Sequence, residues 1–204
     1  MEDKYKSDID RTIEYYEKNA EEFVTSTIHA DVSGLYKHFE KYISTGCRIL
    51  DLGCGSGRDS KYFAKKGYDV VAADPSPVMC DQTRRTANVP TILLKAEEIA
   101  FEEEFDAIWA CASLLHVHKE VMAVTIYRLA RALKHDGIFY ASWKYGDGEH
   151  YDNGRLFSDY KQESMKSLLL NVREVMLIEI WKTEDVRLEK RNSFAWINVI
   201  AKKV

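Results

Sequence analysis

The spacing of hydrophobic positions changes several times along the chain, and each change predicts a different element. From residue 8 to 44, apolar residues recur every three or four positions (Ile13, Tyr16, Phe23, Leu35), which predicts helix. Further on, short apolar runs alternate with helical patterns. The runs predict strands at 47–52, 69–74, 91–95, 105–111 and 138–143. Helices are predicted over 57–66, from Ser76-Pro77 onward, and up to a turn at 135–137.

This alternation of strands and helices is typical of a parallel sheet covered on both faces, so we expect a doubly wound, Rossmann-like α/β fold. The tail is different: a polar loop at 145–158 precedes a helix at 162–170 and two strands at 173–182 and 195–202. Two consecutive strands without a helix between them predict an antiparallel pair at the edge of the sheet.

The chain has no obvious linker or repeat, and its 204 residues suit one domain. We therefore expect a single domain, 1–204, in which a helical lid (1–44) precedes a cofactor-binding core (45–144). Residues 145–204 are expected to form a substrate-side loop, a helix and edge strands.

Composition narrows the possible partners. The net charge is −4 and both signs are well mixed, so the sequence shows no basic cluster of the kind that binds nucleic acid or an anionic membrane. Apolar runs stay short of the ~20 residues that cross a bilayer, and the N-terminus lacks the apolar centre of a signal peptide, so we expect a cytoplasmic protein. The four cysteines are scattered and predict no metal site; Cys111, between two alanines, is expected in the core.

The segment from Arg48 to Ser60 carries the most chemistry. An apolar run ends in Asp51-Leu52, a glycine loop (Gly53, Gly55, Gly57) follows at once, and a helical pattern begins beyond it. A turn with so few side chains lets the backbone touch a nucleotide-like ligand, and the helix N-terminus offers N–H donors to an anion.

The glycine spacing limits which ligand this is. A nicotinamide-dinucleotide site needs G-x-G-x-x-G, but Arg58 occupies the place of the last glycine, and a P-loop would need G-K-[ST]. The next predicted strand ends in Asp74. A ribose-binding acid is expected about 20 residues after the glycine loop, and Asp74 lies at that spacing.

An acid followed by G-x-G-x-G resembles the first motif of class I S-adenosylmethionine-dependent methyltransferases. Two segments, Gly-Ser-Gly-Arg-Asp-Ser and Ile-Trp-Ala-Cys-Ala-Ser-Leu-Leu-His-Val, resemble sequences of the small bacterial group that includes the tellurite-resistance methyltransferases. The resemblance implies a mostly parallel seven-stranded sheet whose last strand is inserted antiparallel. It also implies S-adenosylmethionine as cofactor and S-adenosylhomocysteine as product.

The resemblance assigns roles to residues at the strand ends. Asp74 is expected to bind the ribose hydroxyls. Asp51 either bonds the cofactor's ammonium group, directly or through water, or holds the N–H groups of the loop. Arg58 either pairs with the methionine carboxylate or is solvated. The remaining residues expected to contact the cofactor are Tyr16, Gly53, Cys54, Gly55, Gly57, Pro75, Ser76, Met79, Ala96, Glu97, Glu98, Ala112 and Ser113.

The end of the 105–111 strand bears on the reaction. It lacks the Asn/Asp-Pro-Pro-Tyr segment of amino-methyltransferases that act on bases or glutamine, and Cys111 lacks the neighbouring proline of a cytosine-C5 methyltransferase. His116 is either a general base or a side chain that packs over the cofactor, and His118 is expected at the surface.

The acceptor is expected to be a small molecule, because the chain lacks features of a macromolecular site. Its candidate contacts lie in the N-terminal lid and the later loops: Tyr15, Lys144, Tyr145, Arg155 and Arg187. A non-catalytic module that binds S-adenosylmethionine or S-adenosylhomocysteine, and a methyltransferase acting on protein or nucleic acid, are the alternatives. The sequence does not indicate an oligomeric state.

Overall fold

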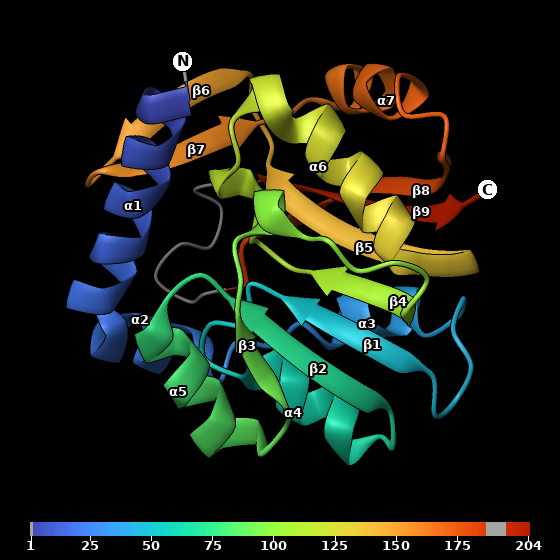
Figure 1. Ribbon diagram of the computed structural model, residues 1–204, viewed down its shortest axis with the longest axis horizontal. Coiled ribbons are helices and arrows are strands. Elements are labelled where there is room, and N and C mark those ends of the chain that lie inside the picture. The colour runs from blue at the N-terminus through green and yellow to red at the C-terminus, as the bar shows by residue number, and fades with distance from the viewer. Residues whose placement is uncertain (1, 187–194) are drawn as a thin grey trace.

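The computed structural model describes residues 2–186 and 195–204, and its centre is a seven-stranded sheet in the order β3-β2-β1-β4-β5-β9-β8 (Figure 1). The strands are β1 (Arg48–Leu52), β2 (Asp69–Asp74), β3 (Thr91–Leu93), β4 (Phe105–Ala110), β5 (Leu133–Lys144), β8 (Val175–Glu184) and β9 (Ala195–Lys203). The first five are parallel, whereas β9 runs antiparallel between β5 and β8. The expected Rossmann-like fold with its antiparallel last strand is thereby confirmed.

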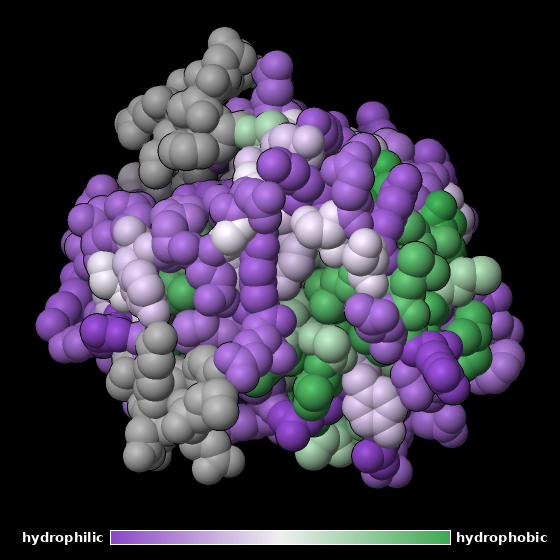
Figure 2. All heavy atoms as spheres, turned by 90° about the horizontal axis from the view of Figure 1, so that it is seen from above, coloured by the Kyte–Doolittle hydropathy of each residue, from purple (hydrophilic) through white to green (hydrophobic). Residues whose placement is uncertain are grey.

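Helices cover both faces of the sheet. They are α1 (Glu2–Lys18), α2 (Ala20–Thr27), α3 (Ser33–Phe39), α4 (Arg58–Lys65), α5 (Pro77–Ala87), α6 (Lys119–Ala132) and α7 (Gln162–Leu170), with 3-10 turns η1 (Ala96–Glu98) and η2 (Leu114–His116). Figure 1 shows α6 and α7 in front of the sheet and α3 and α4 behind it. The surface seen in Figure 2 is mainly hydrophilic, with hydrophobic side chains gathered toward its right-hand side.

The core on the side of α3 and α4 is aromatic. Trp109 of β4 stacks on Tyr140 of β5 with ring centroids 4.1 Å apart, and Phe39 and Phe63 meet Trp109 edge-on. All four are fully buried, and each buried side chain of this size contributes about 1.5–3 kcal/mol. The opposite side packs aliphatic residues of α6 and α7 against the sheet. This packing fixes the carboxyl ends of β1, β2 and β4, where ligands bind in open α/β sheets.

Helix α1 stands across those carboxyl ends, beside β7 and α5 (Figure 1). The predicted N-terminal helical segment is thus present, but it is divided into three helices that are interrupted at Asn19 and between Thr27 and Ser33. In the described part of the chain, no helix is long and apolar enough to cross a membrane.

Residues 145–158 do not form the predicted loop. They contain the hairpin β6 (Gly148–Asp152) and β7 (Arg155–Asp159). Its turn is Asn153-Gly154, with φ of 51° and 81°, the two positive values that an Asn-Gly hairpin turn requires. Every residue of β6 is exposed, so the alternation that reveals a half-buried strand is missing.

The predicted turn at 135–137 is also wrong in part. Helix α6 ends at Ala132 and β5 begins at Leu133, so that His135-Asp136-Gly137 forms an irregularity within the strand. Asp136 has φ of 64°, and the pairing with β4 shifts register opposite it, between Phe105 and Ala107. Strand β3 ends at Leu93, two residues before the predicted end.

Candidate functional site

The loop after β1 turns through three glycines whose backbones lie in the left-handed region. Gly53, Gly55 and Gly57 have φ of 76°, 50° and 78°, which L side chains adopt only with strain. The N–H groups of Gly53 and Cys54 both donate to the carbonyl of Ala73, at 2.7 and 3.0 Å. The loop is therefore anchored to the end of β2 before α4 begins.

The glycine loop packs closely against Ser113, after β4, and against Phe23 of α2. A Cβ on Gly53 would lie 2.3 Å from the Cβ of Ser113, and one on Gly55 would lie 3.1 Å from the ring of Phe23. The first distance is impossible without movement of backbone. Gly53 is thus required by the packing of the loop against the turn that follows β4.

Asp74, at the end of β2, lines the smaller of two cavities that meet at the glycine loop. Its oxygens accept the N–H groups of Gly55 at 3.0 Å and Ser76 at 2.9 Å, so it holds the glycine loop and the start of α5 together. Burial raises the pKa of Asp74 to about 6, and the two N–H donors oppose that rise.

Asp51 does not line either cavity. It is buried behind the loop and accepts a hydrogen bond from the Ser60 hydroxyl of α4 at 2.5 Å. Burial and the nearby charge of Asp59 raise the pKa of Asp51. Of the two roles considered for Asp51, the geometry supports the structural one, with Ser60 rather than the loop N–H groups as the partner.

The smaller cavity, of about 100 Å³, lies between α1 and the ends of β2 and β4. Most of the residues expected at the adenosine half of the cofactor line it: Asp74, Pro75, Ser76, Met79, Ala96, Glu97, Ala112, Ser113 and Tyr16. Burial raises the pKa of the Glu97 carboxyl. Glu98 lies outside both cavities, although it follows Glu97 in η1.

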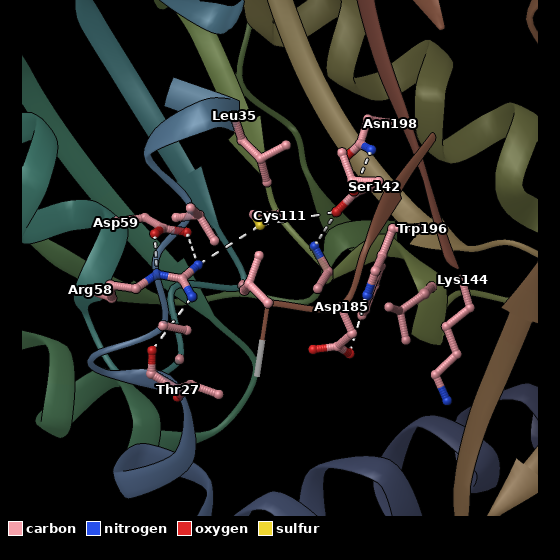
Figure 3. Close-up of a pocket in the computed structure, with 18 of the residues that line it drawn as sticks. Thr27, Leu35, Arg58, Asp59, Cys111, Ser142, Lys144, Asp185, Trp196 and Asn198 are labelled. Carbon is pink, nitrogen blue, oxygen red and sulfur yellow. Dashed lines mark hydrogen bonds and ion pairs between the residues drawn. The ribbon is translucent and has the colours of Figure 1, made fainter. Parts of the chain in front are cut away.

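The larger cavity, of about 540 Å³, continues from the smaller one across the glycine loop. The two share Tyr16, Phe23, Gly53, Gly55, Ala112 and His116. Cys54 and Arg58 line the larger cavity, whereas Gly57 lines neither. Figure 3 shows Arg58 and Asp59 on one side of this space and Ser142, Asn198, Trp196 and Lys144 on the other.

Asp59 holds Arg58 in place. The guanidinium donates to both carboxylate oxygens, from Nε at 2.6 Å and from Nη2 at 2.9 Å. The same carboxylate accepts the Tyr36 hydroxyl at 2.5 Å and the Trp109 indole N–H at 2.9 Å. Burial alone would raise the pKa of Asp59, but these donors and the Arg58 charge hold it below the usual value.

Arg58 is thus neither a solvated side chain nor an isolated cation. Its side chain is 20% exposed on the cavity wall, and its guanidinium also approaches the Thr27 carbonyl at 3.5 Å. Sequence reasoning missed the role of Asp59, because its partners are 23 and 50 residues away in the chain.

Cys111 does not lie wholly in the core as expected. It is partly exposed on the wall of the larger cavity, with its Sγ 3.9 Å from the Arg58 guanidinium and 4.0 Å from the Ser142 hydroxyl (Figure 3). Burial and the Asp59 charge raise the pKa of Cys111 to about 12, so the thiol is protonated at neutral pH.

His116 is held at both ring nitrogens. Nδ1 lies 2.6 Å from the Leu156 carbonyl, which can only accept, so Nδ1 carries the proton and Nε2 accepts the Tyr16 hydroxyl at 2.7 Å. Burial lowers the pKa of His116 to about 3. A neutral imidazole with an occupied Nε2 is poorly placed to act as a general base, and the geometry supports the packing role.

The candidate acceptor residues are only partly brought together. Lys144 and Arg155 line the larger cavity. Tyr15 lies under Arg155, whose guanidinium carbon is 4.0 Å from the Tyr15 ring centroid, and Tyr145 lies under Lys182; neither tyrosine lines the larger or the smaller cavity. Arg187 lies outside the described residues.

The expectation that His118 lies at the surface is wrong. Its side chain is 4% exposed, with Nε2 at 3.1 Å from Asp8 and Nδ1 at 3.3 Å from Glu149. Asp8 also accepts the Tyr151 hydroxyl at 2.6 Å. The buried pair Asp8–His118, with the exposed Glu149 and Tyr151, joins α1 to the β6–β7 hairpin and to the start of α6. No group of three or more potential metal ligands occurs among the residues that the structure describes.

Comparison with known proteins agrees with this geometry. Residues 49–137 match the family model of the methyltransferase domain. The chain is similar to the probable S-adenosyl-L-methionine-dependent methyltransferase TehB of Haemophilus influenzae, with 30% identity over 122 residues. That match covers 55% of this chain and 41% of TehB, so the chain spans less than half of that relative's length.

Solved structures share the fold. A 1,6-didemethyltoxoflavin-N1-methyltransferase of Burkholderia thailandensis superposes with a TM-score of 0.69 at 21% identity, covering 95% of this chain and 90% of that one. A TehB-like S-adenosylmethionine-dependent methyltransferase of Corynebacterium glutamicum gives 0.69 at 18% identity, covering 94% and 98%.

The glycine loop, the acid at the end of β2 and the family match together identify residues 49–137 as a methyltransferase domain, similar in sequence to S-adenosylmethionine-dependent methyltransferases. The similarity to TehB is the relationship expected from the sequence, and the TehB-like structure shares the fold.

Proposed function

We propose that this protein binds S-adenosylmethionine across the glycine loop and transfers its methyl group to a small-molecule acceptor in the larger cavity. The observation that carries the proposal is the continuity of the two cavities. The smaller one ends at a buried carboxylate suited to ribose, and the larger one opens beyond the glycine loop, with space for a second molecule.

The residues present fit the cofactor. Asp74 already accepts two backbone N–H groups and, as a carboxylate with about four acceptor sites, can accept ribose hydroxyls as well. Gly53 and Gly55 line both cavities, where the amino-acid half of the cofactor can approach the loop. Arg58, fixed by Asp59, presents a cation for a carboxylate on the wall of the larger cavity.

Little acid–base chemistry is required of the protein. When bound, S-adenosylmethionine would supply a methyl group that its sulfonium already activates for displacement by a lone pair of the acceptor. The residues around the cavity orient the acceptor and exclude water, which can supply about 7–11 kcal/mol of the barrier reduction. His116 packs beside this space as a neutral ring.

The size of the larger cavity supports a small acceptor. At about 540 Å³ it falls in the range typical of small-molecule sites, and α2, α3, β5, β8 and β9 are among the elements that form its walls. The alternative of a non-catalytic cofactor-binding module predicts no acceptor, and a macromolecular methyltransferase predicts a protein or nucleic-acid acceptor.

One experiment separates these functions. The enzyme is incubated with S-adenosylmethionine and either the low-molecular-mass or the macromolecular fraction of a bacterial extract, separated by ultrafiltration, and S-adenosylhomocysteine release is measured. We expect release with the low-molecular-mass fraction, above that of an Asp74→Ala control. Release only with macromolecules would contradict a small acceptor, and release with neither fraction, despite cofactor binding, would favour the non-catalytic module.

A further inference from the structure

One wall of the larger cavity is a regular face of the sheet. Ser142 of β5 pairs with Asn198 of β9, which pairs with Trp181 of β8. Two residues along, Lys144 pairs with Trp196, which pairs with Thr183. Because side chains alternate between the faces of a strand, these two rows point to the same side. All six residues line the larger cavity.

The two tryptophans give this wall its chemical character. Trp181 and Trp196 are each partly exposed and line the cavity, although Trp181 is already covered on one side by His38, stacked at 4.6 Å between ring centroids. Glu179 bonds Nδ1 of His38 at 2.9 Å and accepts the Tyr42 hydroxyl at 2.6 Å, which fixes that stack. Indole surface left open in a cavity favours an aromatic ligand that can stack on it.

Two hydroxyls beside the indoles retain donor capacity. Thr183 accepts a hydrogen bond from Asn198 Nδ2 at 3.0 Å, and no acceptor for its own O–H is found among the described residues. Ser142 accepts the Ala112 N–H at 2.8 Å, while its O–H has only weak contacts, with the Cys111 sulfur at 4.0 Å and with the Tyr140 side chain. A ligand on this wall is therefore best recognised through hydrogen-bond acceptor atoms, such as ring nitrogens or carbonyl oxygens.

Asn198 acts differently, because its amide is fully engaged. Its Oδ1 accepts the Tyr140 hydroxyl at 2.7 Å, and its Nδ2 donates to Thr183 and to the Trp181 carbonyl at 3.4 Å. It sets the Trp181 and Thr183 positions rather than contacting a ligand.

We infer that the methyl acceptor is a planar aromatic molecule with hydrogen-bond acceptor atoms on its edge, seated against Trp181 and Trp196; this rests on the proposed function. The flat wall, the open indole surfaces and the two hydroxyl donors all fit such a molecule, whereas a small inorganic oxyanion would leave the indoles uncovered.

The test uses protein saturated with S-adenosylhomocysteine. Calorimetry measures binding of 4-hydroxyquinoline and lumazine, which are planar, and of decahydroquinolin-4-ol, a saturated analogue of the first. The variants are Trp196→Leu, Trp196→Phe and Trp181→Leu, with Tyr127→Leu as the control, because Tyr127 is an exposed aromatic residue of α6 outside the cavities. S-adenosylhomocysteine affinity, measured for every variant, reports that the fold and the cofactor site are intact.

We expect at least one planar compound to bind, and the saturated analogue to bind at least tenfold more weakly than 4-hydroxyquinoline or not at all. Each leucine variant should weaken planar binding roughly three- to tenfold, while Trp196→Phe stays within about twofold of wild type. Equal binding of the saturated analogue, no binding of either planar compound, or no effect of the leucine variants would overturn the inference. Failure of S-adenosylhomocysteine itself to bind would instead count against the proposed function.

Discussion

The Tyr16 hydroxyl donates a hydrogen bond to Nε2 of His116 over 2.7 Å, and this bond joins helix α1 to the turn that follows β4. The two residues are 100 positions apart in the chain, and both line the two cavities. The bond spans the space between α1 and η2, and it occupies the only ring nitrogen of His116 that can accept a proton.

The first prediction concerns the pH dependence of catalysis. With S-adenosylmethionine saturating, kcat should show no histidine inflection between about pH 5.5 and 7.5, because burial holds the pKa of His116 near 3. The measurement is a pH–rate profile of wild type and His116→Asn, with His150→Asn as a control on the exposed hairpin. An inflection near the ordinary histidine pKa that disappears only in His116→Asn would show that His116 is a base.

A second pH effect should appear in cofactor affinity. Burial raises the pKa of Asp74 to about 6 in the folded protein, above the ~3.9 of an unfolded aspartate, so the free protein holds this proton more tightly than the unfolded chain. If ribose hydroxyls bond to the ionised carboxylate, S-adenosylhomocysteine affinity falls up to tenfold per pH unit below about 6 and levels off above it.

Calorimetry between about pH 5 and 8 measures this dependence. In Asp74→Asn, binding should be weak and nearly independent of pH. Asp51→Asn is the matched control, because burial also raises the pKa of Asp51 but its carboxylate faces Ser60. If the inflection is lost in Asp51→Asn and kept in Asp74→Asn, the titrating group is Asp51 and the prediction is wrong.

The glycine loop offers a test with a close internal control. Gly53 and Gly46 have nearly equal φ, 76° and 79°, but a Cβ on Gly53 would collide with Ser113 whereas one on Gly46 meets nothing within 4 Å. Gly46→Ala should cost about 1–2 kcal/mol of unfolding free energy, from backbone strain alone. Gly53→Ala should cost more and also abolish cofactor binding. Denaturant unfolding measures the stability of both variants, and calorimetry measures their cofactor affinity. If Gly53→Ala and Gly46→Ala lose equal amounts of both, the close approach of Gly53 to Ser113 is unimportant.

The network around Asp59 predicts a large effect on stability. Asp59→Asn weakens the bidentate hold on Arg58, leaving a mostly buried guanidinium without its counter-ion, and we expect a loss of about 3–5 kcal/mol. Asp69→Asn removes one of two carboxylate partners of Arg48 at the surface, the other being Glu104, and should cost less than about 1 kcal/mol.

Denaturant unfolding measures both losses. Cofactor affinity should fall in Asp59→Asn as well, because Arg58 is no longer aimed along the cavity wall. An Asp59→Asn protein as stable as Asp69→Asn would show that the four hydrogen bonds to Asp59 contribute little.

The elements that sequence reasoning predicted best are those with local signals. The β1–loop–α4–β2 unit follows from an apolar run, three glycines and Asp74, all within 27 residues of Arg48. The β6–β7 hairpin was missed although Asn153-Gly154 marks its turn, because the fully exposed β6 has no hydrophobic alternation.

The parts of the site that sequence could not predict depend on long-range packing. Nothing local to Asp59 indicates that Tyr36 and Trp109 converge on it, and nothing near His118 indicates that α1 buries it through Asp8. The cavity wall that carries Trp181 and Trp196 likewise depends on the register of β5, β9 and β8, which a single sequence does not reveal.

The central claim is that Asp74 and the glycine loop form the cofactor site, and calorimetry with S-adenosylhomocysteine on wild type and Asp74→Ala tests it most directly. We predict micromolar binding to wild type and at least about a hundredfold weakening in the variant, since two hydrogen bonds to a charged acceptor contribute ~1.5–3 kcal/mol each. Absence of binding to a folded wild-type protein, or unchanged affinity in Asp74→Ala, would contradict the account.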